Sequence, residues 1–208
     1  MPRTAGSSTA EAAPRLYLDL GHPESLLAAE RALQVMPVAT EWVPVDLGPA
    51  REVDWDALAH TAAERGLQRL RRPAAFPFDA RAANLAATYA KSTGRTVAFL
   101  QAALRQAYAG GRDLSAPDNV VIAGSACELH PRAVLKALGT AGTQRALDTA
   151  TSGARAAGVT RAPAVVALGQ VFDGDAGLDA AAALLRRHAG GAVERADAAL
   201  RVIPPARG

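Results

Sequence analysis

A histidine follows the first apolar segment of the chain at a sharp turn into a helix. Residues Arg15–Leu20 form a short strand pattern that includes Asp19, Gly21 breaks it, and Pro23 opens a predicted helix. A turn this short points the free N–H groups of the helix N-terminus at one place, which favours anions and suits a reactive side chain. His22 stands there. The positive end of the helix dipole disfavours a second proton on its ring, and a neutral imidazole can donate a hydrogen bond or act as a general base.

The polar neighbours of His22 have both a functional and a structural interpretation. Ser25, about one turn into the helix, either lines a pocket or is plain helix surface. Glu24 in the first turn is explained by its favourable interaction with the helix dipole. Asp19 either orients His22 or caps the turn locally. The sequence leaves these alternatives open.

The composition is that of a helix-rich globular chain. Half of the 208 residues are hydrophobic but only 4% are aromatic, so Ala, Leu and Val dominate. The net charge of +3 is spread along the chain, and the one tight basic cluster, residues 69–72, lacks aromatic platforms; we do not expect nucleic-acid binding. Neither a membrane-spanning run nor a signal peptide is recognisable, so we expect a cytoplasmic protein with a disordered tail at residues 1–14.

The single cysteine and the other histidines suggest no further chemistry. Cys127 cannot form an internal disulfide, and we expect it to be a small buried side chain. His60, His130 and His188 have no ligand-type spacing with one another or with carboxylates. We therefore expect no metal site.

The predicted elements follow the order strand–helix–strand, a block of helices, then strand–strand–helix. In the first part of the chain we expect strands at 15–20 and 41–47 and a helix at 23–34. In the block of helices we expect a helix at 54–62 capped by Asp54, interrupted helices over 79–138, one of them opened by Pro131, and a helix at 143–157. In the last part we expect a strand at 164–168, a turn at Gly169-Gln170, a strand that starts at Val171-Phe172, a loop at 173–177 and a helix at 178–187. Neither group of strands is sufficient by itself, so the helical block interrupts one sheet domain.

The fold class is therefore α/β, a thioredoxin-like sheet with an all-helical insertion between its second and third strands. We assign residues 15–53 and 158–187 to the thioredoxin-like domain and residues 54–157 to the helical insertion. Residues 188–208 form a peripheral C-terminal segment.

Five short motifs carry a resemblance to a known superfamily. They are Tyr17–Pro23, Phe76–Asp79, Tyr108–Leu114, Gly158–Pro163 and Phe172–Gly174, and in this order they extend over roughly residues 15–187, which is most of the chain. In these motifs the chain resembles the DsbA-like thioredoxin superfamily. Within it, the chain is most similar to the branch of 2-hydroxychromene-2-carboxylate isomerases and kappa-class glutathione transferases.

The resemblance implies an active site at the first strand–helix junction, although the side chains there differ. The disulfide oxidoreductases of the superfamily have a Cys-x-x-Cys motif in the window that is His22–Ser25 here, so dithiol redox chemistry has no nucleophile. In the isomerase and transferase branch, a Ser that hydrogen-bonds the glutathione sulfur stands at the position of His22. The resemblance thus implies that His22 is the catalytic residue beside the sulfur, and that Ser25 lies near the same pocket.

A glutathione site is also implied further along the chain. Pro163 matches the cis-proline of the fold, and the backbone of Ala162 would pair with the ligand. The relatives hold glutathione with an Asp-Arg pair that falls at residues 176–177 here, and Asp175 would substitute for it by a shift of one residue. Asp79 lies where relatives contact substrate, and helix capping is the simpler account of it.

Two functions follow. The first is a glutathione-dependent isomerase or transferase-like enzyme that acts on small electrophiles, with glutathione as its cofactor. The second is a catalytically degenerate DsbA-like module that binds a peptide or small molecule. Because related proteins are often dimers, a homodimer is a further expectation, and neither nucleic acid nor membrane is an expected partner.

Overall fold

The structure is a computed structural model that describes residues 12–50 and 52–201. The predicted tail at residues 1–14 lies mostly outside these residues. The described elements are strands β1 (Arg15–Leu18), β2 (Glu41–Pro44), β3 (Ala164–Ala167) and β4 (Gln170–Asp173), and helices α1 (Glu24–Val35), α2 (Trp55–Glu64), α3 (Arg81–Ser92), α4 (Thr96–Tyr108), α5 (Pro117–Ser125), α6 (Pro131–Leu138), α7 (Ala141–Ala156) and α8 (Gly174–Arg201).

The four strands form one mixed sheet in the order β2-β1-β3-β4. Strand β1 is parallel to β2, antiparallel to β3, and in register with both, so that Leu16 lies opposite Trp42 on one side and Val165 on the other. The parallel pair requires a crossover, and α1 supplies it. The predicted α/β class, a thioredoxin-like sheet interrupted by a helical insertion, is confirmed.

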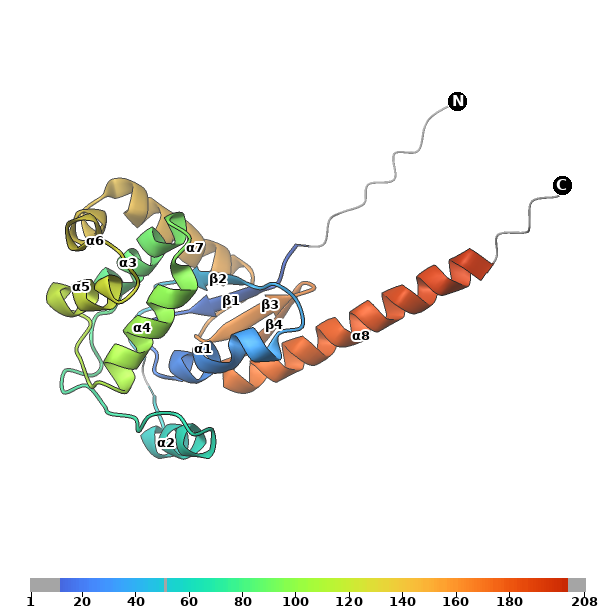
Figure 1. The fold of residues 1–208 in the computed structure, drawn as a ribbon, viewed down its shortest axis with the longest axis horizontal. Coiled ribbons are helices and arrows are strands. Elements are labelled where there is room, and N and C mark those ends of the chain that lie inside the picture. Colours follow the sequence, from blue (N-terminus) through green and yellow to red (C-terminus); the bar gives the residue numbers. More distant parts are fainter. Residues whose placement is uncertain (1–11, 51, 202–208) are drawn as a thin grey trace, which may run out of the picture.

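Helices cover both faces of the sheet (Figure 1). Helices α1 and α8 pack together on one face, where the buried side chains of Leu16, Leu26 and Leu178 belong to the main core. On the other face, Tyr17 and Ala154 of α7 belong to a second cluster. Strict alternation of side chains along β1 explains why the successive residues 16 and 17 enter different cores.

The helical insertion shares the main core with the sheet. Phe99, Leu100 and Tyr108 of α4 are fully buried in it. Two predicted helix starts are confirmed: Asp54 accepts a hydrogen bond from the Ala57 N–H at 2.9 Å, and α6 begins at Pro131. The insertion is thus packed onto the strand–helix junction that carries His22.

The β3–β4 hairpin and the start of α8 differ from the sequence-based expectation. The hairpin turn is Leu168-Gly169, one residue earlier than predicted, and both residues have positive φ, at 50° and 74°. Positive φ at both turn positions matches the right-handed twist of the strands. The predicted loop at 173–177 is absent, because α8 begins at Gly174 directly after β4.

Helix α8 is longer than predicted. It runs for 28 residues to Arg201 instead of ending near Arg187, and its distal half projects beyond the body of the protein (Figure 1). The residues Gly190-Gly191 do not interrupt it, since an interior glycine costs a helix only about 1 kcal/mol. Within residues 12–50 and 52–201, no helix combines the length and the hydropathy needed to cross a bilayer.

Candidate active site

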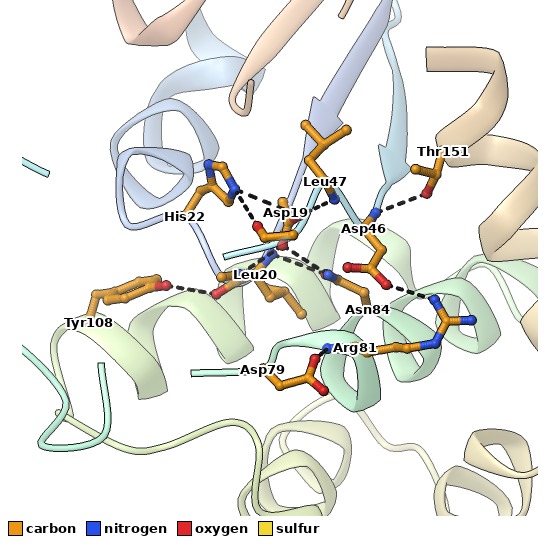
Figure 2. Close-up of polar contacts among 12 residues, drawn as sticks. Asp19, Leu20, His22, Asp46, Leu47, Asp79, Arg81, Asn84, Tyr108 and Thr151 are labelled. Atoms are coloured by element: carbon orange, nitrogen blue, oxygen red, sulfur yellow. Dashed lines mark hydrogen bonds and ion pairs between the residues drawn. The ribbon is translucent and has the colours of Figure 1, made fainter. Parts of the chain in front are cut away.

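The junction between β1 and α1 is built around a buried carboxylate. Asp19 is 1% exposed and accepts three hydrogen bonds (Figure 2). The Gly21 N–H and the Asn84 amide donate to Oδ1, each at 2.9 Å, and the Leu47 N–H donates to Oδ2 at 2.7 Å. Burial raises the pKa of Asp19, whereas the charge of His22 and the three donors oppose this rise. The carboxylate therefore fixes both the turn after β1 and the loop after β2.

Two residues of the insertion complete the junction. Asn84 on α3 is fully buried, and its Oδ1 accepts the Leu20 N–H at 3.0 Å while its amide nitrogen donates to Asp19. The hydroxyl of Tyr108 donates to the Leu20 carbonyl at 2.8 Å. Burial first, and then the charge of Asp19, raises the pKa of Tyr108 well above its usual value, so the hydroxyl remains a donor. The insertion thus holds both backbone groups of Leu20, two residues before His22.

His22 is held by the loop after β2. Its Nε2 lies 3.0 Å from the Gly48 carbonyl oxygen and 3.9 Å from Oδ2 of Asp19. A carbonyl only accepts, so Nε2 carries the proton that is donated. In the neutral ring Nδ1 is then the acceptor, and Figure 2 shows it pointing away from Asp19. The ring has a lone pair on one side and groups that stabilise positive charge on the other.

A cavity of about 380 Å³ adjoins this network. Its wall includes Asp19 and Gly48, the two partners of His22, together with Asp79. The carboxylate of Asp79 also accepts the Arg81 N–H at 2.9 Å, which stabilises the start of α3. Both predicted roles of Asp79, substrate contact and cap, are compatible with this position.

Arg81 connects the wall of the cavity to α7. Its guanidinium donates to Asp46 at 2.7 Å and to Asp148 at 3.0 Å, and the hydrogen bond to Asp46 is the main cause that raises the pKa of Arg81. The N–H of Asp46 in turn donates to the Thr151 hydroxyl at 3.0 Å. The loop after β2, which bonds His22, is therefore anchored by α3 and α7 (Figure 2).

Three of the predicted ligand residues are buried. Ser25 is 0% exposed, and its hydroxyl has no hydrogen-bond partner within the described part of the chain. Ala162 is also 0% exposed, Pro163 is buried, and the peptide bond between them is cis. The Pro163 carbonyl accepts the N–H of Gly174, the first residue of α8, at 2.8 Å. The side chains of these three residues line no open surface.

Asp175 belongs to an ion-pair cluster that joins α1, α2 and α8. Both ends of the Arg65 guanidinium bond its carboxylate, one of them at 3.0 Å, and Arg31 donates to it at 3.2 Å. Arg31 also pairs with Asp179. The carboxylate of Asp175 is thus engaged with cations of the protein itself.

The neighbouring position 177 has no room for a side chain. A Cβ on Gly177 would lie 2.6 Å from the carbonyl carbon and oxygen of Phe172. The close approach of α8 to β4 therefore explains why glycine stands where the resemblance places one member of an Asp-Arg pair.

One exposed ion pair crosses the junction. Nη2 of Arg161 lies 3.3 Å from Oε1 and 3.2 Å from Oε2 of Glu24. Glu24 is two residues after His22, and Arg161 immediately precedes Ala162. The pair therefore joins the first turn of α1 to the segment that leads into β3.

Cys127 is a small buried side chain, as predicted. It is 6% exposed, its thiol donates to the Ala123 carbonyl at 3.3 Å, and burial raises its pKa. Over the two described ranges, no three His, Cys, Asp or Glu side chains come together in a way that could hold a metal ion.

Sequence reasoning missed Gly48, Asn84, Tyr108 and Arg161 as site residues. Asn84 offered a signal, because it is the one amide on the alanine-rich face of a predicted helix. Tyr108 was named only as the first residue of the motif Tyr108–Leu114, without a role in the site. Gly48 contributes a backbone carbonyl, which no sequence pattern marks.

Comparisons with known proteins identify the fold. The chain matches no protein-family model, and no curated protein matches it in sequence. Among solved structures, 2-hydroxychromene-2-carboxylate isomerase matches with a TM-score of 0.71 and 17% identity, over 91% of this chain and 99% of that one. A probable DsbA oxidoreductase from Streptomyces coelicolor matches with a TM-score of 0.70 and 19% identity, over 85% and 89%. The cytosolic disulfide reductase DsbM from Pseudomonas aeruginosa, solved with GSH, matches with a TM-score of 0.60 and 14% identity, over 85% and 98%.

The protein thus has a thioredoxin-like fold. More narrowly, its structural neighbours are DsbA-like thioredoxin-fold proteins, which confirms the predicted resemblance at the level of the fold.

Proposed function

We propose that the protein is a glutathione-dependent enzyme of the isomerase or transferase type that acts on small electrophiles, with His22 as its proton acceptor. The observation that carries this proposal is the fixed orientation of the His22 ring. Its Nε2 donates to the Gly48 carbonyl at 3.0 Å, which leaves Nδ1 as the basic nitrogen. A base held in one tautomer by a second group is the arrangement that activates nucleophiles in many enzymes.

The groups at the junction suit a thiol-bearing peptide. Bound glutathione would supply a thiol, whose thiolate is the nucleophile. A free cysteine thiol has a pKa of about 8.5, so a base is needed to ionise it near neutral pH. In this proposal Nδ1 of His22 accepts that proton, and the Gly48 carbonyl, at 3.0 Å from Nε2, and the Asp19 carboxylate, at 3.9 Å, stabilise the imidazolium. Arg161 adds a cation that suits the carboxylates of the peptide.

Direct dithiol redox chemistry plays no part in this proposal, because the window His22–Ser25 contains no cysteine. The enzymes among the structural neighbours include an isomerase and disulfide reductases or oxidoreductases. Of these activities, isomerisation is the one that His22, as a proton acceptor without a neighbouring cysteine, would support.

One observation favours a second candidate function, a DsbA-like binding or interaction module without catalysis. Ser25 and Ala162, two predicted ligand residues, are completely buried, and Asp175 is held by Arg31 and Arg65. Such a module would bind a partner without needing the base at His22.

Calorimetric titration with glutathione separates the two. The enzyme proposal predicts binding that weakens in H22A and persists in H60A, a control that removes a histidine with a 75% exposed side chain from α2. It also predicts that the ultraviolet thiolate absorbance of bound glutathione develops at lower pH with the unchanged protein than with H22A. Millimolar glutathione without heat of binding would favour the module.

The location and oligomeric state belong to the same proposal. We place the protein in the cytoplasm, as DsbM is cytosolic, and expect a homodimer. Cell fractionation and analytical ultracentrifugation test these two statements.

A further inference from the structure

The ion pair between Glu24 and Arg161 has an unusual geometry for an arginine–carboxylate pair. A single nitrogen, Nη2, reaches both carboxylate oxygens, at 3.2 and 3.3 Å, and Arg161 makes no other polar contact within the described residues. Arginine binds a carboxylate best with two nitrogens in parallel, at about 2.7–2.9 Å. The fork of Arg161 is therefore only partly used.

Helix α1 carries a second glutamate–arginine pair, between Glu30 and Arg105, whose geometry differs from that of the Glu24–Arg161 pair. Arg105 bonds Glu30 of α1 with two nitrogens, at 2.5 and 2.7 Å, and the side chains are 53% exposed for Arg105 and 15% exposed for Glu30. In the first pair, the side chains are 54% exposed for Arg161 and 27% exposed for Glu24. The two arginines are equally exposed, so the pairs differ in geometry and in the carboxylate: Arg105 uses two nitrogens on the more buried Glu30, whereas Arg161 uses one nitrogen on the more exposed Glu24 and keeps donors for a competing anion.

The position of Arg161 indicates where a bound anion would lie. It is two residues before Pro163, and its partner is in the first turn of α1, two residues after His22. The N-terminal end of α1 adds a partial positive charge near the same place. An anion between α1 and the Ala162–Pro163 segment would meet both the guanidinium and the helix end.

We propose that Arg161 is the carboxylate-binding residue of this site and that Glu24 occupies its guanidinium until the ligand arrives. This inference rests on the proposed function, and the ligand group is a carboxylate of glutathione. On binding, the guanidinium exchanges the Glu24 carboxylate for the ligand carboxylate, and Glu24 turns to solvent. No covalent bond changes in this step. Glu24 thereby lowers the affinity for every anionic ligand, because each must displace the Glu24 carboxylate from the guanidinium.

The test compares glutathione with its dimethyl ester, which keeps the thiol but lacks both carboxylates. Affinities are measured by calorimetry for the unchanged protein, R161A, R161K and E24Q, with R155A as the matched control, since Arg155 is an exposed arginine of α7. Circular dichroism verifies that each variant is folded.

The expected pattern has opposite signs for the two partners. R161A binds glutathione about tenfold more weakly, as for the loss of a charge-assisted pair, and R161K falls between it and the unchanged protein. E24Q binds glutathione roughly two- to fivefold more tightly, the scale of a released surface ion pair. None of these three variants changes the affinity for the ester, and R155A behaves like the unchanged protein with both ligands.

Other results overturn the inference in distinguishable ways. If R161A binds glutathione as tightly as the unchanged protein, Arg161 is not the carboxylate-binding residue and the proposed function survives. If R161A weakens glutathione and ester equally, its role is structural and the assignment is wrong. If the unchanged protein binds no glutathione, both the assignment and the proposed function fail.

Discussion

Replacement of Asn84 by alanine is the most direct test of the buried network at the junction. The side chain accepts from the Leu20 N–H and donates to Asp19, and N84A leaves both groups without that partner. Leu20 and Asp19 are 0% and 1% exposed, so bulk solvent has little access to either group. An orphaned buried neutral group costs about 1–3 kcal/mol, and a hydrogen bond to a charged group contributes about 1.5–3 kcal/mol. Alanine regains about 0.5 kcal/mol through its helix propensity.

We therefore expect N84A to lower the free energy of unfolding by about 2–5 kcal/mol. Urea denaturation followed by circular dichroism measures this value. The matched control is N119A on α5, because Asn119 also donates a side-chain hydrogen bond, to the Asp113 carbonyl at 2.7 Å, but is only half-buried. Its expected cost is below about 1 kcal/mol. A cost for N84A no larger than that for N119A would refute the role assigned to the network.

Three further predictions concern pH, backbone clearance and thiol reactivity. Burial raises the pKa of Asp19 in the folded state, so the native protein holds the carboxyl proton of Asp19 more tightly than the unfolded chain does. The contribution of protonated Asp19 to stability is therefore full below the ordinary carboxyl pKa of about 3.9, and it is lost as the pH rises through the pKa of the folded state. The stability of the unchanged protein relative to D19N should therefore fall with rising pH in urea titrations from pH 4 upward; a rise contradicts the sign. G177A should lower the melting temperature, because a Cβ at this position would lie 2.6 Å from the backbone of Phe172. G190A on the same helix has open space around it and should stabilise the protein by up to about 1 kcal/mol. Equal shifts of the melting temperature in the two variants would show that α8 can move away from β4. Cys127 should react with a thiol reagent only when the protein is denatured, and labelling of the native protein as fast as free cysteine would exclude its burial.

The overall fold could be predicted from the sequence because local signals agree with one another. The apolar run Ala164–Leu168 and the glycine and proline residues around Gly21 mark the sheet segments without reference to distant residues. Boundaries that depend on tertiary packing were less accurate. The turn lies at Leu168-Gly169, one residue before the predicted Gly169-Gln170. Helix α8 continues through Gly190 and Gly191, because an exposed helix tolerates the propensity cost of two glycines.

The sequence predicts the strand–helix junction on which the candidate site is built, but not the contacts that surround His22 there. His22 stands at the predicted junction, and Asp19 lies beside it. The partners that define its chemistry come from far along the chain: Gly48 is 26 residues away, and Asn84 is 65 residues from Asp19. Such contacts arise from the packing of the insertion onto the sheet, which periodicity does not encode.

The strand order has a consequence for the synthesis of the protein. Strand β1 lies between β2 and β3, yet β3 follows β2 only after about 120 residues, most of which belong to the helical insertion. At a translation rate of about 5–20 residues per second, the nascent chain exposes the unpaired edge of β1 for roughly 6–24 s before its partner is made. An open apolar edge invites pairing with other chains. The helical insertion that shapes the junction around His22 thus also delays the step that closes the edge of β1.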